Sequence, residues 1–245
     1  MRSRLWILAI PNTTGGRRKR GFVFGDKPSQ FQRQGYNRHR LTREPGKGKI
    51  MSSENKAFDP SIAWRGNKKM SWPTWSIPAV LTCPNRTPMC EASCYALKAE
   101  RQYPNVLPAR KKNLKLTVRA DFVPMMAREI QRKNPKIFRI HESGDFYSKT
   151  YFLKWREIAE LCPDTQFFAF TKVFSLFRFK LPDNFVLVAS VFPDEKRKAP
   201  KNAPTFTAVL KGDSIPAEIQ CEGSCDTCGI CPFATKAVKV WCEIH

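Results

Sequence analysis

The sequence predicts an α/β protein whose parallel strands form an incomplete or irregular TIM-like barrel. Short apolar segments of strand length alternate with longer segments of helical periodicity, and such crossovers make neighbouring strands parallel. About five strands are visible, which is too few for a complete eightfold barrel. The 245 residues, 42% of them hydrophobic, are enough for a buried core and exclude a disordered chain. An open doubly wound sheet is the alternative.

The N-terminal segment is unusually basic. Residues 1–50 hold 13 Lys and Arg against two acidic residues, so one fifth of the chain has half of the net charge of +22. The segment has no sustained helical or alternating period. We expect a flexible basic arm that contacts phosphates of a nucleic acid, with its aromatic side chains stacking on bases. A solvated tail is the alternative, and Met51 is a second candidate for the start of translation.

Regular structure begins at about residue 71. Residues 76–82 are apolar and of strand length, and they end at Cys83. Residues 107–118 and 121–133 have the composition of basic helices. The second of these follows Asp121, a capping residue type, and holds Pro124 in its first turn, where the missing N–H is harmless. We therefore expect one strand and two helices here.

The second half of the predicted domain alternates strands and helices. A short apolar strand is expected at 136–140, followed by a helix at 149–162. That helix spaces Phe152, Trp155, Ala159 and Cys162 by three or four residues, which gives it one apolar face. Further strands are expected at 166–171, 185–190 and 205–210. The whole chain then divides into the arm 1–50, a barrel-like domain 51–215 and a cysteine-rich segment 216–245 packed on the barrel.

The expected compartment is the cytoplasm. The N-terminal apolar run, residues 5–10, is followed by four consecutive basic residues and not by a cleavage site. No apolar run approaches the roughly 20 residues of a membrane helix. In a reducing compartment, nine cysteines are expected to bind a metal or to serve catalysis, and not to form disulfides.

The densest cysteine pattern lies near the C-terminus. Four thiols fall within eleven residues: Cys221, Cys225, Cys228 and Cys231. Closely spaced triplets suit a 4Fe-4S cluster, whereas structural zinc usually takes two short pairs separated by a longer loop. We expect an iron–sulfur cluster here, with zinc as the alternative. Gly223 and Gly229 would let the backbone wrap tightly around it.

A second set, Cys83, Cys90 and Cys94, follows the first predicted strand. Functional groups in parallel α/β proteins gather beyond the carboxyl ends of the strands. Three thiolates on a cubane leave one iron open, as catalysis requires. Alternatively, these three join a C-terminal cysteine around a single closed cluster, or they bind zinc. The number of clusters, one or two, stays open.

Polar residues crowd the end of the strand predicted at 136–140. They are His141, Glu142, Ser143 and Asp145, and Gly144 among them would permit close approach of a ligand. Lys172 ends the next strand and would pair with an anion there. The alternatives are that Asp145 caps the helix at 149–162 and that Lys172 is solvated. Of the remaining thiols, Cys162 is expected in the core, and Cys242 is a spare ligand or a surface thiol.

Together these motifs resemble the phage "gene product 88" family. The resemblance covers about residues 71–232 and leaves the arm outside. The matching motifs are residues 77–84, the segment from Cys90 to Ala96, the basic Arg110 to Asn113, residues 138–146, residues 168–172 and the segment from Cys225 to Cys231. The family implies a phage or prophage origin, and hence the cytoplasm of the host cell.

More distantly, the layout is similar to radical S-adenosylmethionine enzymes. By that resemblance, the set that begins at Cys83 holds the catalytic cluster, with S-adenosylmethionine on its open iron, and the C-terminal four hold an auxiliary cluster. Ser143, Gly144 and Asp145 take the place of the turn that holds the methionine amino group. The candidate cofactor-binding residues are then Ser143, Gly144, Lys172 and Tyr95, and the candidate catalytic residues are His141, Glu142 and Asp145. The spacing departs from the usual loop, being Cys-x6-Cys-x3-Cys in place of Cys-x3-Cys-x2-Cys.

Two classes of function follow. The favoured hypothesis is a phage-type 4Fe-4S protein on a radical-SAM-like scaffold that associates with nucleic acid through the arm and helices 107–133, with catalysis left open. As an enzyme, it would modify a nucleic acid or another substrate and would need an electron donor. The alternative is a zinc-stabilised nucleic-acid-binding protein.

Overall fold

The computed structural model describes residues 59–67, 69–215 and 218–244. The chain divides into two units, of which the second comprises residues 50–245. The predicted basic arm and Met51 lie outside the described residues, which all belong to the second unit. Within the described ranges, no helix is both long and apolar enough to cross a bilayer.

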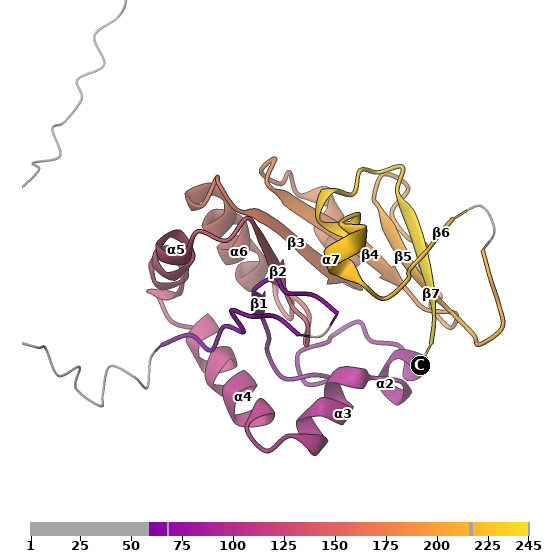
Figure 1. Ribbon diagram of the computed structural model, residues 1–245, viewed down its shortest axis with the longest axis horizontal. Coiled ribbons are helices and arrows are strands. Elements are labelled where there is room, and N and C mark those ends of the chain that lie inside the picture. Colours follow the sequence, from indigo (N-terminus) through magenta and orange to yellow (C-terminus); the bar gives the residue numbers. More distant parts are fainter. Residues whose placement is uncertain (1–58, 68, 216–217, 245) are drawn as a thin grey trace, which may run out of the picture. The chain divides into compact units, whose positions relative to one another are not determined.

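The second unit is built on a seven-stranded, all-parallel sheet with the order β1-β2-β3-β4-β5-β7-β6 (Figure 1). The strands are β1 Thr74–Trp75, β2 Ile137–Ile140, β3 Gln166–Thr171, β4 Phe185–Val191, β5 Thr205–Val209, β6 Ile219–Gln220 and β7 Lys239–Glu243. The prediction of an α/β protein with a parallel sheet is confirmed. The sheet does not close into a barrel, because the two edge strands of the described sheet, β1 and β6, are only two residues long and do not pair with each other.

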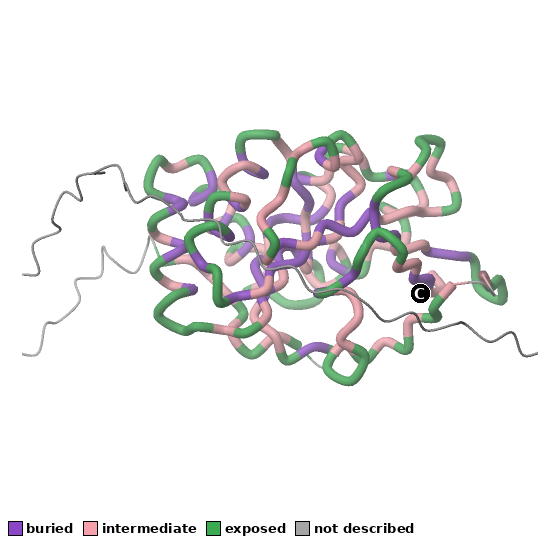
Figure 2. Tube along the Cα trace, turned by 90° about the horizontal axis from the view of Figure 1, so that it is seen from above, coloured by how far each residue is buried: buried purple, intermediate pink, exposed green. Residues whose placement is uncertain are grey.

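One face of the sheet is covered by α5 (Phe122–Lys133) and α6 (Lys149–Leu161). Phe138 of β2 lies beside Phe167 of β3, which lies beside Phe185 of β4, so this face presents a row of aromatic rings to the helices. Trp155 of α6 and Phe122 of α5 are fully buried against that row. Figure 2 shows the buried stretches gathered in the interior of this unit.

The opposite face is covered by the C-terminal segment. The 3-10 helix η2 (Cys231–Phe233) packs on β3 and β4, and the Gln166 side chain donates to the Pro232 carbonyl over 2.8 Å. Phe168, Phe170 and Arg139 belong to this face. Helix α7 (Cys225–Cys228) precedes η2, and β7 then enters the sheet between β5 and β6.

Three further helices connect β1 to α5: α2 (Pro88–Ala92), α3 (Tyr95–Gln102) and α4 (Val106–Thr117). The 3-10 helix η1 (Phe174–Arg178) follows β3. The predicted helices at 107–118, 121–133 and 149–162 and the strands from residue 136 to 210 are confirmed to within a residue or two. The helices α2, α3 and α7 and the strands β6 and β7 were not predicted.

The strand predicted at 76–82 is wrong. Regular pairing is confined to β1, and the following residues form turns. Pro78 has no N–H for a ladder, and Val80 adopts a φ of 61°, which a strand does not allow. The Ile77 N–H donates instead to the Ser143 carbonyl over 3.1 Å, which joins this segment to the end of β2.

Candidate functional site

Cys83, Cys90 and Cys94, here called the first thiol group, lie close to Asp145 and Lys172 at the carboxyl ends of β2 and β3. Burial raises the pKa of Cys83 to about 12, and the charges of Asp145 and of the two other thiols act in the same direction. Burial also raises the pKa of Cys90, which the adjacent Lys172 ammonium opposes. The structure thus brings together the three cysteines and two of the polar residues predicted with them.

Contacts from other segments fix the loop that holds these thiols. Thr87 caps α2 by accepting the Cys90 N–H over 3.2 Å, and Asp194 accepts the Met89 N–H over 2.9 Å. Cys94 is the N-cap of α3, where its sulfur accepts the Leu97 N–H over 3.4 Å. Residues 192–204, which follow β4, therefore help to position the first thiol group.

Two residues of the predicted basic helix have structural roles. Arg110 is 7% exposed and pairs with Glu100 at 3.0 Å, and Glu100 also accepts the Ala79 N–H. The Asn113 amide donates to the carbonyls of Ser61 and Ser76 over 2.9 and 2.8 Å. The exposed cations of this helix are other residues, among them Lys111 and Lys115.

Asp145 joins the ends of β2 and β3, and the Lys172 side chain extends the connection to β4. Its carboxylate, 6% exposed, accepts the Thr171 hydroxyl at 2.6 Å, the Lys172 N–H at 2.9 Å and the Phe146 N–H at 2.7 Å. Burial raises the pKa of Asp145, and these three hydrogen bonds oppose the rise. The Lys172 ammonium donates to the Ser190 hydroxyl of β4 over 2.9 Å. The alternative role of Asp145 as a helix cap is wrong, because Ser148 caps α6.

Gly144 makes a close approach, although to protein and not to an open site. Its φ is +85°, and a Cβ here would lie 2.4 Å from Ile77 Cγ1 and 2.6 Å from the Thr82 hydroxyl. Both neighbours belong to the segment that leads to Cys83. Within the described residues, the buried hydroxyl of the adjacent Ser143 has no hydrogen-bond partner. Gly144 therefore lets the turn after β2 pack directly on the cysteine loop.

His141 lies in the aromatic core. Its ring is 4.6 Å from Phe146 between centroids, and its Nε2 lies 2.9 Å from the Tyr151 hydroxyl. Burial lowers the pKa of His141 to about 3, and the charge of Arg139 acts in the same direction. The imidazole is neutral at ordinary pH and 3% exposed, which favours a structural role. Its assignment as a catalytic residue stays a prediction.

Tyr95 is hydrogen-bonded to the backbone carbonyl of Glu142, and the Glu142 side chain bonds elsewhere. The Glu142 carboxylate accepts the Asn67 amide at 2.7 Å, and the Glu142 carbonyl accepts the Tyr95 hydroxyl at 2.7 Å. The Tyr95 ring is 57% exposed, but its hydroxyl points inward. There, burial raises the pKa of Tyr95, and the positive charge of Arg139 opposes the rise.

The second thiol group comprises Cys221, Cys225, Cys228 and Cys231. Burial raises the pKa of Cys231 to about 12, and the charges of the three other thiols add to the rise. The group is attached to residues 69–71, because the Cys225 N–H donates to the Lys69 carbonyl over 2.8 Å and Asp226 accepts the Ser71 hydroxyl over 2.9 Å.

The two remaining cysteines differ in position. Cys162 is 3% exposed in the helix-covered core, as predicted, and its thiol donates to the Ala127 carbonyl at 3.7 Å. Cys242 lies on β7 next to the second thiol group. Burial raises its pKa to about 11, and the charge of Cys221 acts in the same direction.

Arg139 lies between the two thiol groups and was not identified from the sequence. Burial raises the pKa of Cys225, and the Arg139 charge opposes this rise, as it does at Tyr95 beside Cys94. Its guanidinium stacks over Phe170 at 5.1 Å, and its buried Nε has no hydrogen-bond partner in the described ranges. The sequence does indicate it, because Arg139 is the single charged residue in the otherwise apolar strand Ile137–Ile140.

As they stand, the described side chains contain no group of three or more His, Cys, Asp or Glu placed to hold a single metal ion. The arrangement does supply two groups of thiols, each with a neighbouring cation: Lys172 at the first and Arg139 at the second. Such groups can bind soft metals or exchange disulfides.

The chain is similar to proteins of two mycobacteriophages. It is 31% identical to the Gene 88 protein of Mycobacterium phage L5 over 185 residues, which is 61% of this chain and 77% of the relative. It is 36% identical to the Gene 88 protein of Mycobacterium phage D29 over 103 residues, 38% of this chain and 43% of the relative. No solved structure matches, so the resemblance to radical S-adenosylmethionine enzymes stays a prediction.

The family model "Gene product 88" matches residues 36–218. The match starts before the predicted residue 71 and includes part of the basic segment that was expected to lie outside. It contains the first thiol group and the residues around Asp145, and it ends before Cys221. On the extent of this match, the chain belongs to the Gene product 88 family.

Proposed function

We propose that this protein is an iron–sulfur protein that holds 4Fe-4S clusters at its two thiol groups. The observation that supports the proposal is the grouping of seven of the nine cysteines, three in the first thiol group and four in the second. Cys162, in the core, stands apart from both. Three thiolates leave one iron open to a further ligand, and four close a cluster.

The residues present fit such clusters. Burial and mutual repulsion raise the thiol pKa values at Cys83 and Cys231, so the free thiols hold protons that a metal would displace. The thiolates of a cubane bind different irons, so they need not converge on one point. Arg139, with its unpartnered Nε, and Lys172 supply positive charge beside the anionic ligands.

When bound, a 4Fe-4S cluster supplies one-electron transfer, and an electron donor is then required. The open position of the first thiol group suits a small ligand with an amino and a carboxyl group, for which S-adenosylmethionine is the candidate. Lys172 would orient the carboxylate. Asp145, held by three hydrogen bonds, keeps the ends of β2 and β3 in place beneath it.

The test is anaerobic reconstitution of the full chain with counts of iron, sulfide and zinc. We expect Cys83→Ser/Cys90→Ser/Cys94→Ser to lose about four irons and four sulfides, the content of one cubane, and Cys225→Ser/Cys228→Ser/Cys231→Ser to lose the other cluster. Cys162→Ala is the matched control and should keep both. Zinc without sulfide would refute the proposal and support the zinc alternative.

A spectroscopic arm tests the open iron. The electron paramagnetic resonance spectrum of the reduced protein should change when S-adenosylmethionine is added, provided that the first thiol group is intact. The variant that lacks the second thiol group should still show the change. A spectrum that the ligand leaves unaltered would remove the radical-enzyme hypothesis and leave an electron-transfer or structural cluster.

A further inference from the structure

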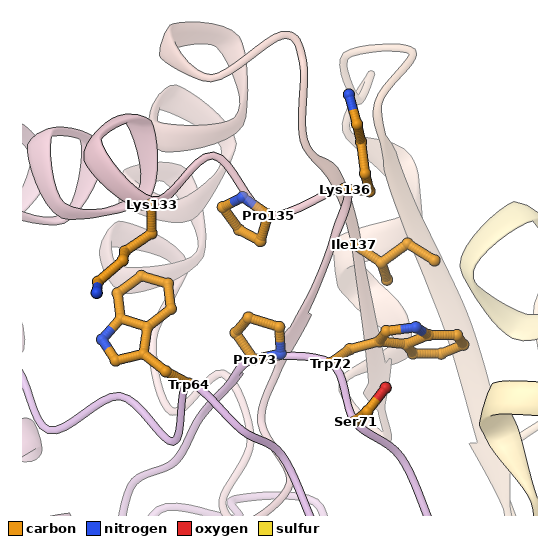
Figure 3. A pocket seen from close by; sticks show the side chains of 8 residues that line it. All are labelled: Trp64, Ser71, Trp72, Pro73, Lys133, Pro135, Lys136 and Ile137. Atoms are coloured by element: carbon orange, nitrogen blue, oxygen red, sulfur yellow. The ribbon is translucent and has the colours of Figure 1, made fainter.

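A pocket of about 360 Å³ lies at the amino ends of β1 and β2, and no cysteine lines it. Trp64 and Trp72 lie on either side of Pro73, but they pack on opposite faces of the sheet, and the Trp72 ring points away from Trp64; the lining also includes Pro135, Lys133 and Lys136 (Figure 3). All eight lining residues are neutral or cationic. A half-buried indole with an exposed ammonium group over its ring suits a flat, apolar ligand that bears negative charge.

The two indoles are held by buried rings. Trp64 meets Phe138 edge-on, with 6.4 Å between ring centroids, and Trp72 meets Phe168 in the same way at 5.8 Å. Phe138 and Phe168 are 0% and 2% exposed. Because each half-buried indole packs against a buried ring of the sheet, it is already ordered before a ligand arrives, which lowers the entropic cost of binding.

The polar groups around the pocket select for an anion. The Lys133 ammonium lies 5.9 Å from the centre of the Trp64 ring, a weaker contact than a base stacked on the indole. The nearest acid that contacts a lining residue is Asp226, and it is already occupied by the Ser71 N–H and hydroxyl. Lys133 and Lys136 are both exposed; the Lys133 ammonium lies beside the Trp64 ring, and the Lys136 side chain points away from both indoles (Figure 3).

We propose that the Trp64–Trp72 pocket binds a base of a single-stranded nucleic acid, with Lys133 and Lys136 contacting the flanking phosphates. Stacking on an aromatic ring combined with lysine–phosphate contacts is the general mode of strand binding without sequence preference. The net charge of +22 favours this occupant over a neutral peptide. The proposal does not depend on the clusters, and its failure would leave the predicted iron and sulfide counts unchanged.

The test uses fluorescence anisotropy of the full chain with a labelled oligothymidylate and an abasic strand of equal length. Both strands have the same phosphates, so contacts made by other basic segments cancel in the comparison. We expect Trp64→Leu to weaken binding of the oligothymidylate about 5- to 150-fold, the loss of one stacked base, and to leave the abasic strand unchanged. Trp64→Phe, which keeps a ring, should recover much of the loss.

The lysines give a second readout that does not disturb the core. Lys133→Gln/Lys136→Gln should reduce the slope of log affinity against log salt by about 1.4, since each contact with a single strand contributes about 0.7. Lys201→Gln/Lys211→Gln removes the same charge from exposed lysines elsewhere and is the matched control. If the control pair changes the slope equally, or Trp64→Leu weakens both strands alike, the proposal is wrong.

Two further ligands distinguish other occupants. If thymidine monophosphate binds through Trp64 as tightly as the oligothymidylate, the pocket takes a free nucleotide and the strand assignment is overturned. If a proline-rich peptide depends on Trp64 while neither strand does, the pocket is a peptide site and the proposal is wrong.

Discussion

Replacing Gly144 with alanine tests how tightly the turn after β2 is packed on the cysteine loop. The new Cβ would lie 2.4 Å from Ile77 Cγ1 and 2.6 Å from the Thr82 hydroxyl, and the residue would have to keep a φ of +85°. The φ costs about 1–2 kcal/mol for a residue with a Cβ. Overpacking at a buried contact adds about 1–3 kcal/mol. We expect Gly144→Ala to lower the free energy of unfolding by about 2–5 kcal/mol.

Gly212→Ala is the matched control. Gly212 has a φ of +87°, but a Cβ there would meet nothing within 4 Å, so this variant has only the backbone cost. Urea unfolding followed by tryptophan fluorescence would compare both variants with the wild type. The difference between them, about 1–3 kcal/mol, measures the contact with Ile77 and Thr82. Equal losses in both variants would mean that the contact with Ile77 and Thr82 costs nothing and that the turn is not tightly packed.

Three other variants test separate parts of the structure. The unfolded chain takes up a proton on His141 below pH 6.5, whereas the folded protein does so only near pH 3, so the free energy of unfolding should fall by about 2 kcal/mol between pH 7 and pH 5. Asparagine tolerates the φ of 65° at this position, so His141→Asn should remove this pH dependence in urea titrations at the two pH values. A pH dependence that persists in the variant would contradict the burial of a neutral imidazole. Arg110→Met leaves the buried Glu100 carboxylate without its ion pair and should lower the free energy of unfolding by about 3–5 kcal/mol. Arg132→Met, at the exposed pair with Glu129, should lower it by less than about 1 kcal/mol, and equal losses in the same urea titration would mean that burial of the pair has no effect. Asn113→Ala removes three hydrogen bonds to Ser61 and Ser76 and should lower the free energy of unfolding by about 2–4 kcal/mol. Limited proteolysis at residues 59–67 should then be faster, and an unchanged rate would mean that other contacts hold that segment.

The elements that could be predicted from the sequence are those whose own periodicity decides their structure. Helix α6 shows Phe152, Trp155 and Ala159 at helical spacing, and β3 and β4 are dense apolar runs, so burial selects one conformation for each. The first strand was misplaced because residues 76–82 look apolar while their backbone bonds to the end of β2. Strand β7 was missed because its two buried residues, Val240 and Trp241, are adjacent and lie in a five-residue run with charged ends, which shows no strand period.

The candidate site was predictable in part. The spacing of the cysteines gave both thiol groups, and the polar run after β2 gave Asp145, whose neighbours at Thr171 and Lys172 come from the adjacent strand. Which side of the sheet each side chain faces depends on backbone angles that a sequence does not show. His141, with its φ of 65°, turns into the core, whereas Arg139 lies on the face with the second thiol group.

The path of the chain through β6 and β7 has a thermodynamic consequence. The second thiol group lies in the crossover between these strands, which pair in parallel from Ile219 with Val240, and the Cys221 N–H extends the pairing to the Trp241 carbonyl. Any metal held by the four thiols would close a shorter loop, residues 221–231, inside the one that the strand pairing closes, so each event would lower the entropic cost of the other. Loss of such a metal by oxidation would loosen first the two-residue edge strand β6, because β7 is also paired with β5 along its length.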